Sequence, residues 1–124
     1  MPNRQIPAET EFGVREIKTK TDKLNSYSKE AQRYSRNREY EKARAMVNKM
    51  LELNPNSAAA FRVLGATYYS QGRTEQAIES IDKAIKIIEM NLDPEEIFSG
   101  DKRSREDSIR FLKELIELYR RNPR

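Results

Sequence analysis

Apolar side chains recur three and four positions apart along most of this chain. Such spacing predicts amphipathic α-helices, because a helical turn takes 3.6 residues and the repeated positions then share one face. Turn-forming residues interrupt the pattern near Asn37, at 54–56 and at Gly72. We therefore expect an all-α fold. The expected helices are one from about Leu24 capped by Thr19 or Thr21, one from Tyr40 to Leu53, one after Ser57, one capped by Thr74, and one from Lys102 or Ser104 to Arg121.

The segment at 1–20 does not follow this pattern. Two prolines and a glycine punctuate it, and its apolar residues fit neither a helical nor a strand spacing. We expect an N-terminal arm outside the folded domain. Two interpretations stay open: a disordered terminus, since unanchored chain ends fray, or a segment that docks on a partner. Docking would use Ile6, Phe12 and Val14.

The chain after the fourth helix carries a local helix-start signal. Asp93 is a capping residue, Pro94 suits the first helical position and Glu96 lies three residues after the cap. These residues predict a short helix through Phe98. The last helix is then apolar over half of its circumference at about 100° per residue. Because the end of the fourth helix is also apolar nearly all round, we expect the last helix to cover it.

Two interpretations of this wide apolar surface remain open. In the first, one group of residues covers the fourth helix and a second group closes the remaining gap. In the second, the second group stays exposed and binds another copy of the chain or a different partner. The covering group is Ile109, Leu112, Ile116 and Tyr119, which would lie over Ile85, Ile87 and Met90. The second group is Phe111, Leu115 and Leu118.

The chain matches itself at an offset of 34 residues, the distance from Tyr27 to Phe61. Aromatic, small or apolar residues coincide at each matched position. The other pairs are Ala31 with Gly65, Tyr34 with Tyr68, Ala43 with Ala77, Val47 with Ile81 and Met50 with Ala84. A helix-turn-helix unit of this period resembles the tetratricopeptide repeat.

This resemblance implies antiparallel helix pairs stacked as a short solenoid. It divides a domain at 21–124 into a first repeat at 24–57, a second at 58–91, and a degenerate third repeat at 92–124 that acts as a cap. A cap is needed because the last unit of a repeat array would otherwise expose its packing face. The small matched residues are expected in the core, where they let two helices approach closely.

The resemblance also implies that the first helix of each pair lines a concave groove that receives a peptide. The available positions lie about 100° from the core stripes, one residue further round each helix. Arginines there would pair with acidic groups of a ligand, above a shallow apolar floor. Simple solvation of these positions is the alternative, since scattered apolar surface residues are normal. The groove residues predicted in this way are Gln32, Arg36, Arg62, Val63, Ala66 and Tyr69.

Composition limits the chemistry that these residues can perform. The 124 residues include no histidine and no cysteine, which removes the usual general base near neutral pH, the thiol nucleophile and the main soft metal ligands. We therefore expect no enzyme activity, no cofactor and no metal site. No apolar run is long enough for a signal-peptide core or a membrane span, which predicts a cytoplasmic protein.

The expected function is that of an adaptor or assembly factor that binds a peptide segment of a partner protein. RNA binding is an alternative, because residues 101–124 hold eight basic and five acidic groups within a chain of net charge +4. Acidic residues interleave with these basic groups and flatten the potential, which disfavours nucleic acid. A third reading is a structural subunit that the arm at 1–20 tethers in a larger complex.

Overall fold

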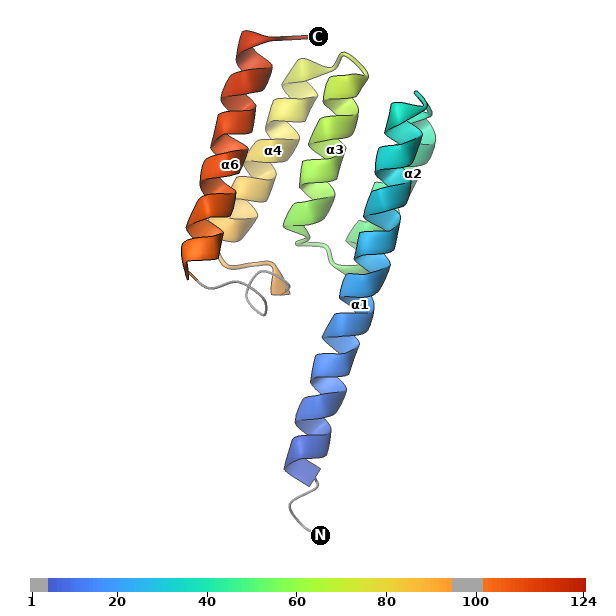
Figure 1. Ribbon diagram of the computed structural model, residues 1–124, viewed down its shortest axis with the longest axis vertical. Helices are drawn as coiled ribbons and strands as arrows, with labels where there is room; N and C mark the ends of the chain where they lie inside the picture. Colours follow the sequence, from blue (N-terminus) through green and yellow to red (C-terminus); the bar gives the residue numbers. More distant parts are fainter. Residues whose placement is uncertain (1–4, 95–101) are drawn as a thin grey trace.

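The computed structural model describes the backbone of residues 5–94 and 102–124, with side chains from residue 19 to 94 and from 104 onward. These residues form helices joined by short turns, and no strand occurs among them, so the predicted all-α class is confirmed. Apart from its first residues, the short helix predicted through Phe98 lies outside the described residues. The helices are α1 (Gln5–Arg36), α2 (Tyr40–Leu53), α3 (Ala58–Ser70), α4 (Thr74–Glu89) and α6 (Lys102–Arg121) (Figure 1).

The first helix is much longer than the sequence pattern predicted. α1 begins at Gln5 and not near Thr19 or Thr21, and its N-terminal half extends beyond the other helices (Figure 1). Pro7 lies in the first turn, where a backbone amide has no partner within the helix and proline is tolerated. Gly13 costs a helix interior about 1 kcal/mol, which weakens the helix without ending it. The prediction that this helix begins near Thr19 or Thr21 is therefore wrong.

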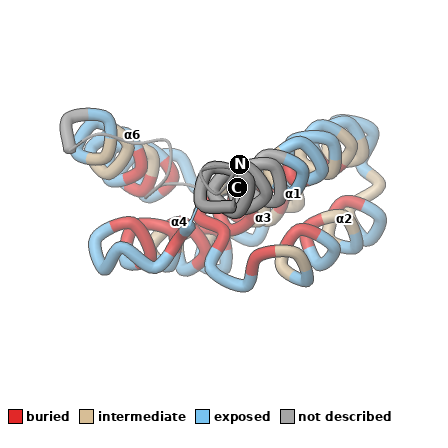
Figure 2. Tube along the Cα trace, turned by 90° about the horizontal axis from the view of Figure 1, so that it is seen from below, coloured by how far each residue is buried: buried red, intermediate tan, exposed pale blue. Residues whose placement is uncertain are grey.

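The helices stack as antiparallel pairs. α1 packs on α2 and α3 on α4, while α3 also contacts both helices of the first pair and α6 packs against α4. Figure 2 looks along the helices and shows α1 and α6 on either side of α3, with α2 and α4 along the opposite side. This arrangement confirms the predicted short solenoid of helix pairs with a capping helix.

The turns inside the two pairs and the end of α4 share one backbone geometry. Each contains a residue in the left-handed region: Arg38 at φ 62°, Gly72 at φ 87° and Asn91 at φ 55°. The following amide donates to a carbonyl five residues earlier, as in the 2.8 Å bond from Arg73 N to Tyr68 O. Such bonds satisfy carbonyls that a helix end would leave unpaired. Arg38 and Gly72 occupy equivalent repeat positions, so the first turn places an arginine where the second has a glycine.

Most of the matched residues of the two repeats lie in the core, as predicted, while Tyr27, Tyr34 and Tyr68 are partly buried. Gly65 marks a close approach of α3 and α4: a Cβ built there would lie 2.6 Å from Ile81 Cδ1 and 3.1 Å from the Ala77 carbonyl oxygen. Any side chain at Gly65 therefore requires its neighbours to move. The buried members are Ala31, Ala43, Val47 and Met50 in the first repeat, and Phe61, Gly65, Ala77, Ile81 and Ala84 in the second.

The capping helix covers α4 with one side. Leu112, Ile116 and Tyr119 are buried in one cluster with isoleucines of α4, which confirms that α6 closes the end of the stack. Met90 is 66% exposed, so the prediction that α6 covers it is wrong. The physical reason is its position, since Met90 follows the last helical residue of α4, where the chain turns.

A buried carboxylate ties the start of α3 to the chain after α4. Asp93 is 2% exposed. Its Oδ1 accepts from Asn54 Nδ2 at 2.8 Å and its Oδ2 accepts from the Ala58 amide at 2.9 Å. Ser57 Oγ accepts from the Ala60 amide at 3.1 Å, which confirms Ser57 as the N-cap of α3. Asp93 therefore caps the first turn of a helix that lies 35 residues earlier in the sequence.

Candidate functional site

Three helices contribute exposed side chains to one surface, which we call the α1–α3–α6 face. The 2.8 Å hydrogen bond between Ser35 and Thr67 shows which side of α1 meets α3. The stacked rings of Tyr69 and Tyr119 show which side of α6 meets α3. Positions next to these contacts, further round each helix, line the face. They are Gln32 and Arg36 on α1, Arg62 and Ala66 on α3, and Phe111 and Leu118 on α6, all exposed.

A hollow of about 330 Å³ lies on this face between α3 and α6. Arg62 lines it from α3 and Phe111 from α6, together with the small residues Ala58 and Ala59. The sequence predicted a groove containing Arg62 and a separate interface containing Phe111. The structure instead brings these two residues together at one hollow.

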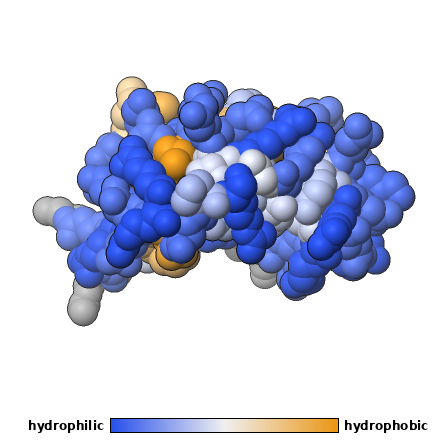
Figure 3. All heavy atoms as spheres, turned by 90° about the horizontal axis from the view of Figure 1, so that it is seen from above, coloured by the Kyte–Doolittle hydropathy of each residue, from blue (hydrophilic) through white to orange (hydrophobic). Residues whose placement is uncertain are grey.

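The α6 side of the face is apolar. Phe111 is 55% exposed and Leu118 is 48% exposed, while Leu115 between them is half-buried against the core. Their spacing of four and three residues places them along one stripe of the helix. Figure 3 shows a largely hydrophilic surface from above, with hydrophobic atoms in only a few places. Phe111 and Leu118 thus do not close a core gap, and contiguous exposed apolar residues often mark an interface.

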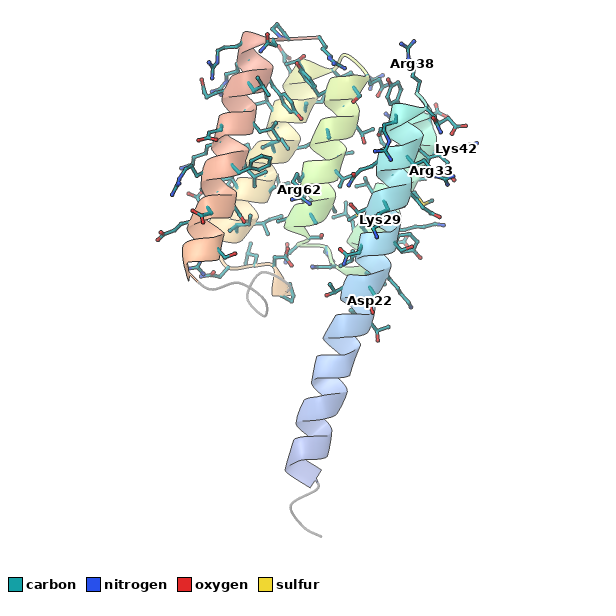
Figure 4. All side chains as sticks on the ribbon, viewed as in Figure 1. Asp22, Lys29, Arg33, Arg38, Lys42 and Arg62 are labelled. Carbon is teal, nitrogen blue, oxygen red and sulfur yellow. The ribbon has the colours of Figure 1, made fainter. Side chains whose placement is uncertain are left out.

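The α1 and α3 side of the face is basic. Lys29 and Arg36 on α1 and Arg62 on α3 are all exposed. In Figure 4, Arg62 lies on α3 between α6 and α1, with Lys29 on the part of α1 level with it. Within the described ranges, the ion pairs involve none of these three cations. Arg110 on α6 differs, because its guanidinium lies 3.3 Å from the Asp107 carboxylate.

Sequence reasoning missed three contributors to this face, Lys29, Ser104 and Ser108. Lys29 lies seven residues before Arg36, so the two cations share one stripe of α1, and this spacing is a signal that the sequence did contain. Ser104 lines the hollow one helical turn before Ser108. Their hydroxyl groups give no distinctive sequence pattern. Gln32, which was predicted, is exposed and donates from Nε2 to Ser28 Oγ at 3.1 Å.

Comparison with models of known protein families matches residues 35–89 to a tetratricopeptide repeat. The matched segment contains α2, α3 and α4. Residues 35–89, a little less than half of the chain, are thus similar to a tetratricopeptide repeat. Comparison of the chain with curated proteins and with solved structures gave no match.

Tetratricopeptide repeats are a non-catalytic family that generally mediates protein–protein interactions. The described part of the chain contains no group of three or more histidine, cysteine, aspartate or glutamate residues that could hold a metal ion. A search of the same residues finds no helix with the length and apolar character needed to cross a membrane.

Val63 does not belong to the exposed face, contrary to the prediction. It is 3% exposed and lies in a buried cluster with Leu24, Ala31 and Val47 of the first helix pair. The second tetratricopeptide unit packs α3 against both helices of the preceding pair, so the buried arc of α3 is wider than one stripe. Val63 fills the seam between units and is not available to a ligand.

Tyr69 has a structural role that the groove prediction overlooked. Its ring stacks on Tyr119 with centroids 3.9 Å apart and planes inclined by 13°. Its hydroxyl donates to the carbonyl oxygen of Asn122. Burial, followed by the neighbouring Tyr69, raises the pKa of the Tyr119 hydroxyl above its ordinary value. Tyr69 therefore attaches the cap to the tetratricopeptide repeat, through partners about fifty residues away that no local sequence pattern reveals.

The chain after α6 is fixed to the turn between α3 and α4. Thr74 was predicted as an N-cap, but it is the first residue of α4 and makes no capping bond. Its Oγ1 instead accepts from the Arg124 amide at 2.8 Å. The Arg124 guanidinium also lies 4.9 Å from the centre of the Tyr69 ring, which adds a cation–π contact. These contacts hold the cap at the turn end of α3.

Proposed function

We propose that this chain is an adaptor or assembly factor whose α1–α3–α6 face receives a segment of a partner protein. The observation that carries the proposal is the exposed Phe111 ring beside the exposed Arg62 guanidinium at one hollow. Protein interfaces concentrate binding energy in aromatic and arginine side chains near a pocket. The protein-interaction role that is general in tetratricopeptide repeats supports the same function.

The proposed layout gives each segment a part in this function. Repeats at 24–57 and 58–91 present α1 and α3, and the capping unit at 92–124 presents α6. In this layout the cap does more than cover the core, because its Phe111 and Leu118 form one wall of the binding surface. The segment at 1–20 is an additional docking element outside the face.

The test is to block the centre of the face with one substitution. Ala66 is exposed on α3, and Ala66→Arg places a long charged side chain between the two walls. Ala45 is exposed on α2, in the opposite layer, so Ala45→Arg is the matched control. Proteins retained from an extract of the native source by each immobilised form would be quantified by mass spectrometry.

The proposal expects a set of proteins retained by the wild type and by Ala45→Arg but reduced by about tenfold or more for Ala66→Arg. Circular dichroism would check that all three forms fold alike. Equal retention by all three forms would show that the α1–α3–α6 face is not the binding surface.

A further inference from the structure

We infer that the segment received by the α1–α3–α6 face is an amphipathic helix of a partner protein with one acidic side and one apolar side. This inference rests on the proposed function and specifies the chemistry of the partner. The acidic side lies toward α1 and Arg62, and the apolar side lies toward α6.

The acidic side follows from the charges of the face. Lys29, Arg36 and Arg62 are exposed, and no ion pair within the described ranges neutralises them. The carboxylate that lines the hollow belongs to Asp107, and Arg110 lies 3.3 Å from it. The positive charges of the face are therefore available to pair with acidic groups of a partner. Arginine favours carboxylates, which accept paired hydrogen bonds from its guanidinium.

The apolar side follows from α6. Phe111, Leu115 and Leu118 form a row with spacings of four and three, the heptad-like spacing by which apolar residues of one helix pack against another helix. On either side of Arg62, α3 carries the small residues Ala59, which is half-buried, and Ala66, which is exposed, and these leave room for a helix backbone to come close. A helix presents its own side chains at the same spacing, so its apolar row can interlock with the row of α6.

The two sides differ in chemistry, and this difference fixes how the helix sits. Acidic side chains placed against Phe111 would lose hydration without gaining a partner. Basic side chains placed against Arg62 and Arg36 would be repelled. The face therefore selects a helix by the relative position of its acidic and apolar sides, and not by net charge.

The experiment uses three synthetic peptides of about 14 residues, a length that spans roughly 20 Å as a helix. The first carries leucines along one side of the helix and glutamates along the adjacent side. The second replaces every glutamate with lysine, and the third has the composition of the first in scrambled order. Binding of each labelled peptide to the full chain would be measured by fluorescence anisotropy at low and high salt.

The acidic amphipathic peptide should bind at least about tenfold more tightly than either control, and added salt should weaken its binding. Arg62→Glu should weaken it by about tenfold and favour the lysine peptide instead, while Phe111→Ala should weaken both ordered peptides. Lys113→Glu reverses a charge at an exposed position about 160° round α6 from Phe111 and should change nothing.

Equal binding of the acidic and lysine peptides, no binding by any of the three peptides, or an equal effect of Arg62→Glu and Lys113→Glu would overturn the inference. A chain that sediments as a dimer, and becomes monomeric with Arg62→Glu, would also overturn it by showing that a second copy occupies the face. The outcome with Ala66→Arg separates the two proposals. If Ala66→Arg loses natural partners but none of the three peptides binds the wild type, the face binds partner segments other than an acidic amphipathic helix.

Discussion

Replacing Asp93 with alanine should destabilise the whole fold, although Asp93 lies after the end of α4 and not within a helix pair. Its carboxylate is 2% exposed and accepts hydrogen bonds from Asn54 Nδ2 at 2.8 Å and from the Ala58 amide at 2.9 Å. Asp93→Ala leaves both donors buried without these acceptors. It also removes a negative group from the N-terminal end of α3, where the helix dipole favours one.

The magnitude follows from the two hydrogen bonds. A bond to a charged acceptor contributes about 1.5 to 3 kcal/mol, and a buried donor left unsatisfied costs about 1 to 3 kcal/mol. We expect Asp93→Ala to lower the free energy of unfolding by about 3 kcal/mol, which is a large share of the roughly 5 to 15 kcal/mol of a typical domain. At about 4 °C per kcal/mol, the melting temperature should fall by about 12 °C.

Urea denaturation followed by circular dichroism would measure this loss, with Asp93→Asn as an intermediate case that retains one acceptor oxygen. The control is Asp82→Ala, which removes a half-exposed carboxylate 3.0 Å from Lys86. Such exposed pairs contribute about 0 to 1 kcal/mol, so this variant should stay close to the wild type. A loss below about 1 kcal/mol for Asp93→Ala would refute the reasoning that its carboxylate joins the two repeat ends.

Other parts of the fold give predictions of similar precision. Ala77→Leu should cost about 1 to 3 kcal/mol, because Ala77 is 0% exposed where α3 and α4 meet, and an unchanged melting temperature would contradict that packing. Arg38→Gly should stabilise the chain by about 0.5 to 1 kcal/mol in urea denaturation, and Gly72→Ala should destabilise it by about as much, since both positions have a left-handed backbone. Burial raises the pKa of Tyr119, so the folded state keeps this proton more tightly than the unfolded state. The associated stability is full below about pH 10 and is lost as pH rises through the folded pKa, so Tyr119→Phe should show a smaller drop in urea midpoint between about pH 8 and pH 11.

The sequence predicted the parts of the fold that depend on periodic spacing. Ala31, Ala77 and Ile81 are buried because a helix places residues three and four apart on one face, and such a pattern is visible without a structure. The Ser57 cap and the Gly72 turn were also predictable, because each depends on the chemistry of one residue at a helix end.

Contacts between distant segments were not predictable in this way. The Asp93 cap of α3 and the stacking of Tyr69 on Tyr119 each join residues that share no local pattern. Val63 shows the same limit, since its burial depends on the angle at which α3 meets the first helix pair. Two of the six predicted groove residues, Val63 and Tyr69, are occupied by contacts with neighbouring helices, because the exposed arc of a helix is set by every neighbour that packs on it.

The two walls of the α1–α3–α6 face should contribute unequally to binding. A phenylalanine side chain has roughly 200 Å² of surface, and 55% exposure leaves about 110 Å² to be covered by a partner. At about 25 cal/mol per Å², covering the Phe111 ring would contribute roughly 2.7 kcal/mol. An exposed ion pair to Arg62 would contribute about 0 to 1 kcal/mol and is weakened by salt. The apolar wall should therefore supply most of the affinity, and the cations should mainly determine which helix binds and in which orientation.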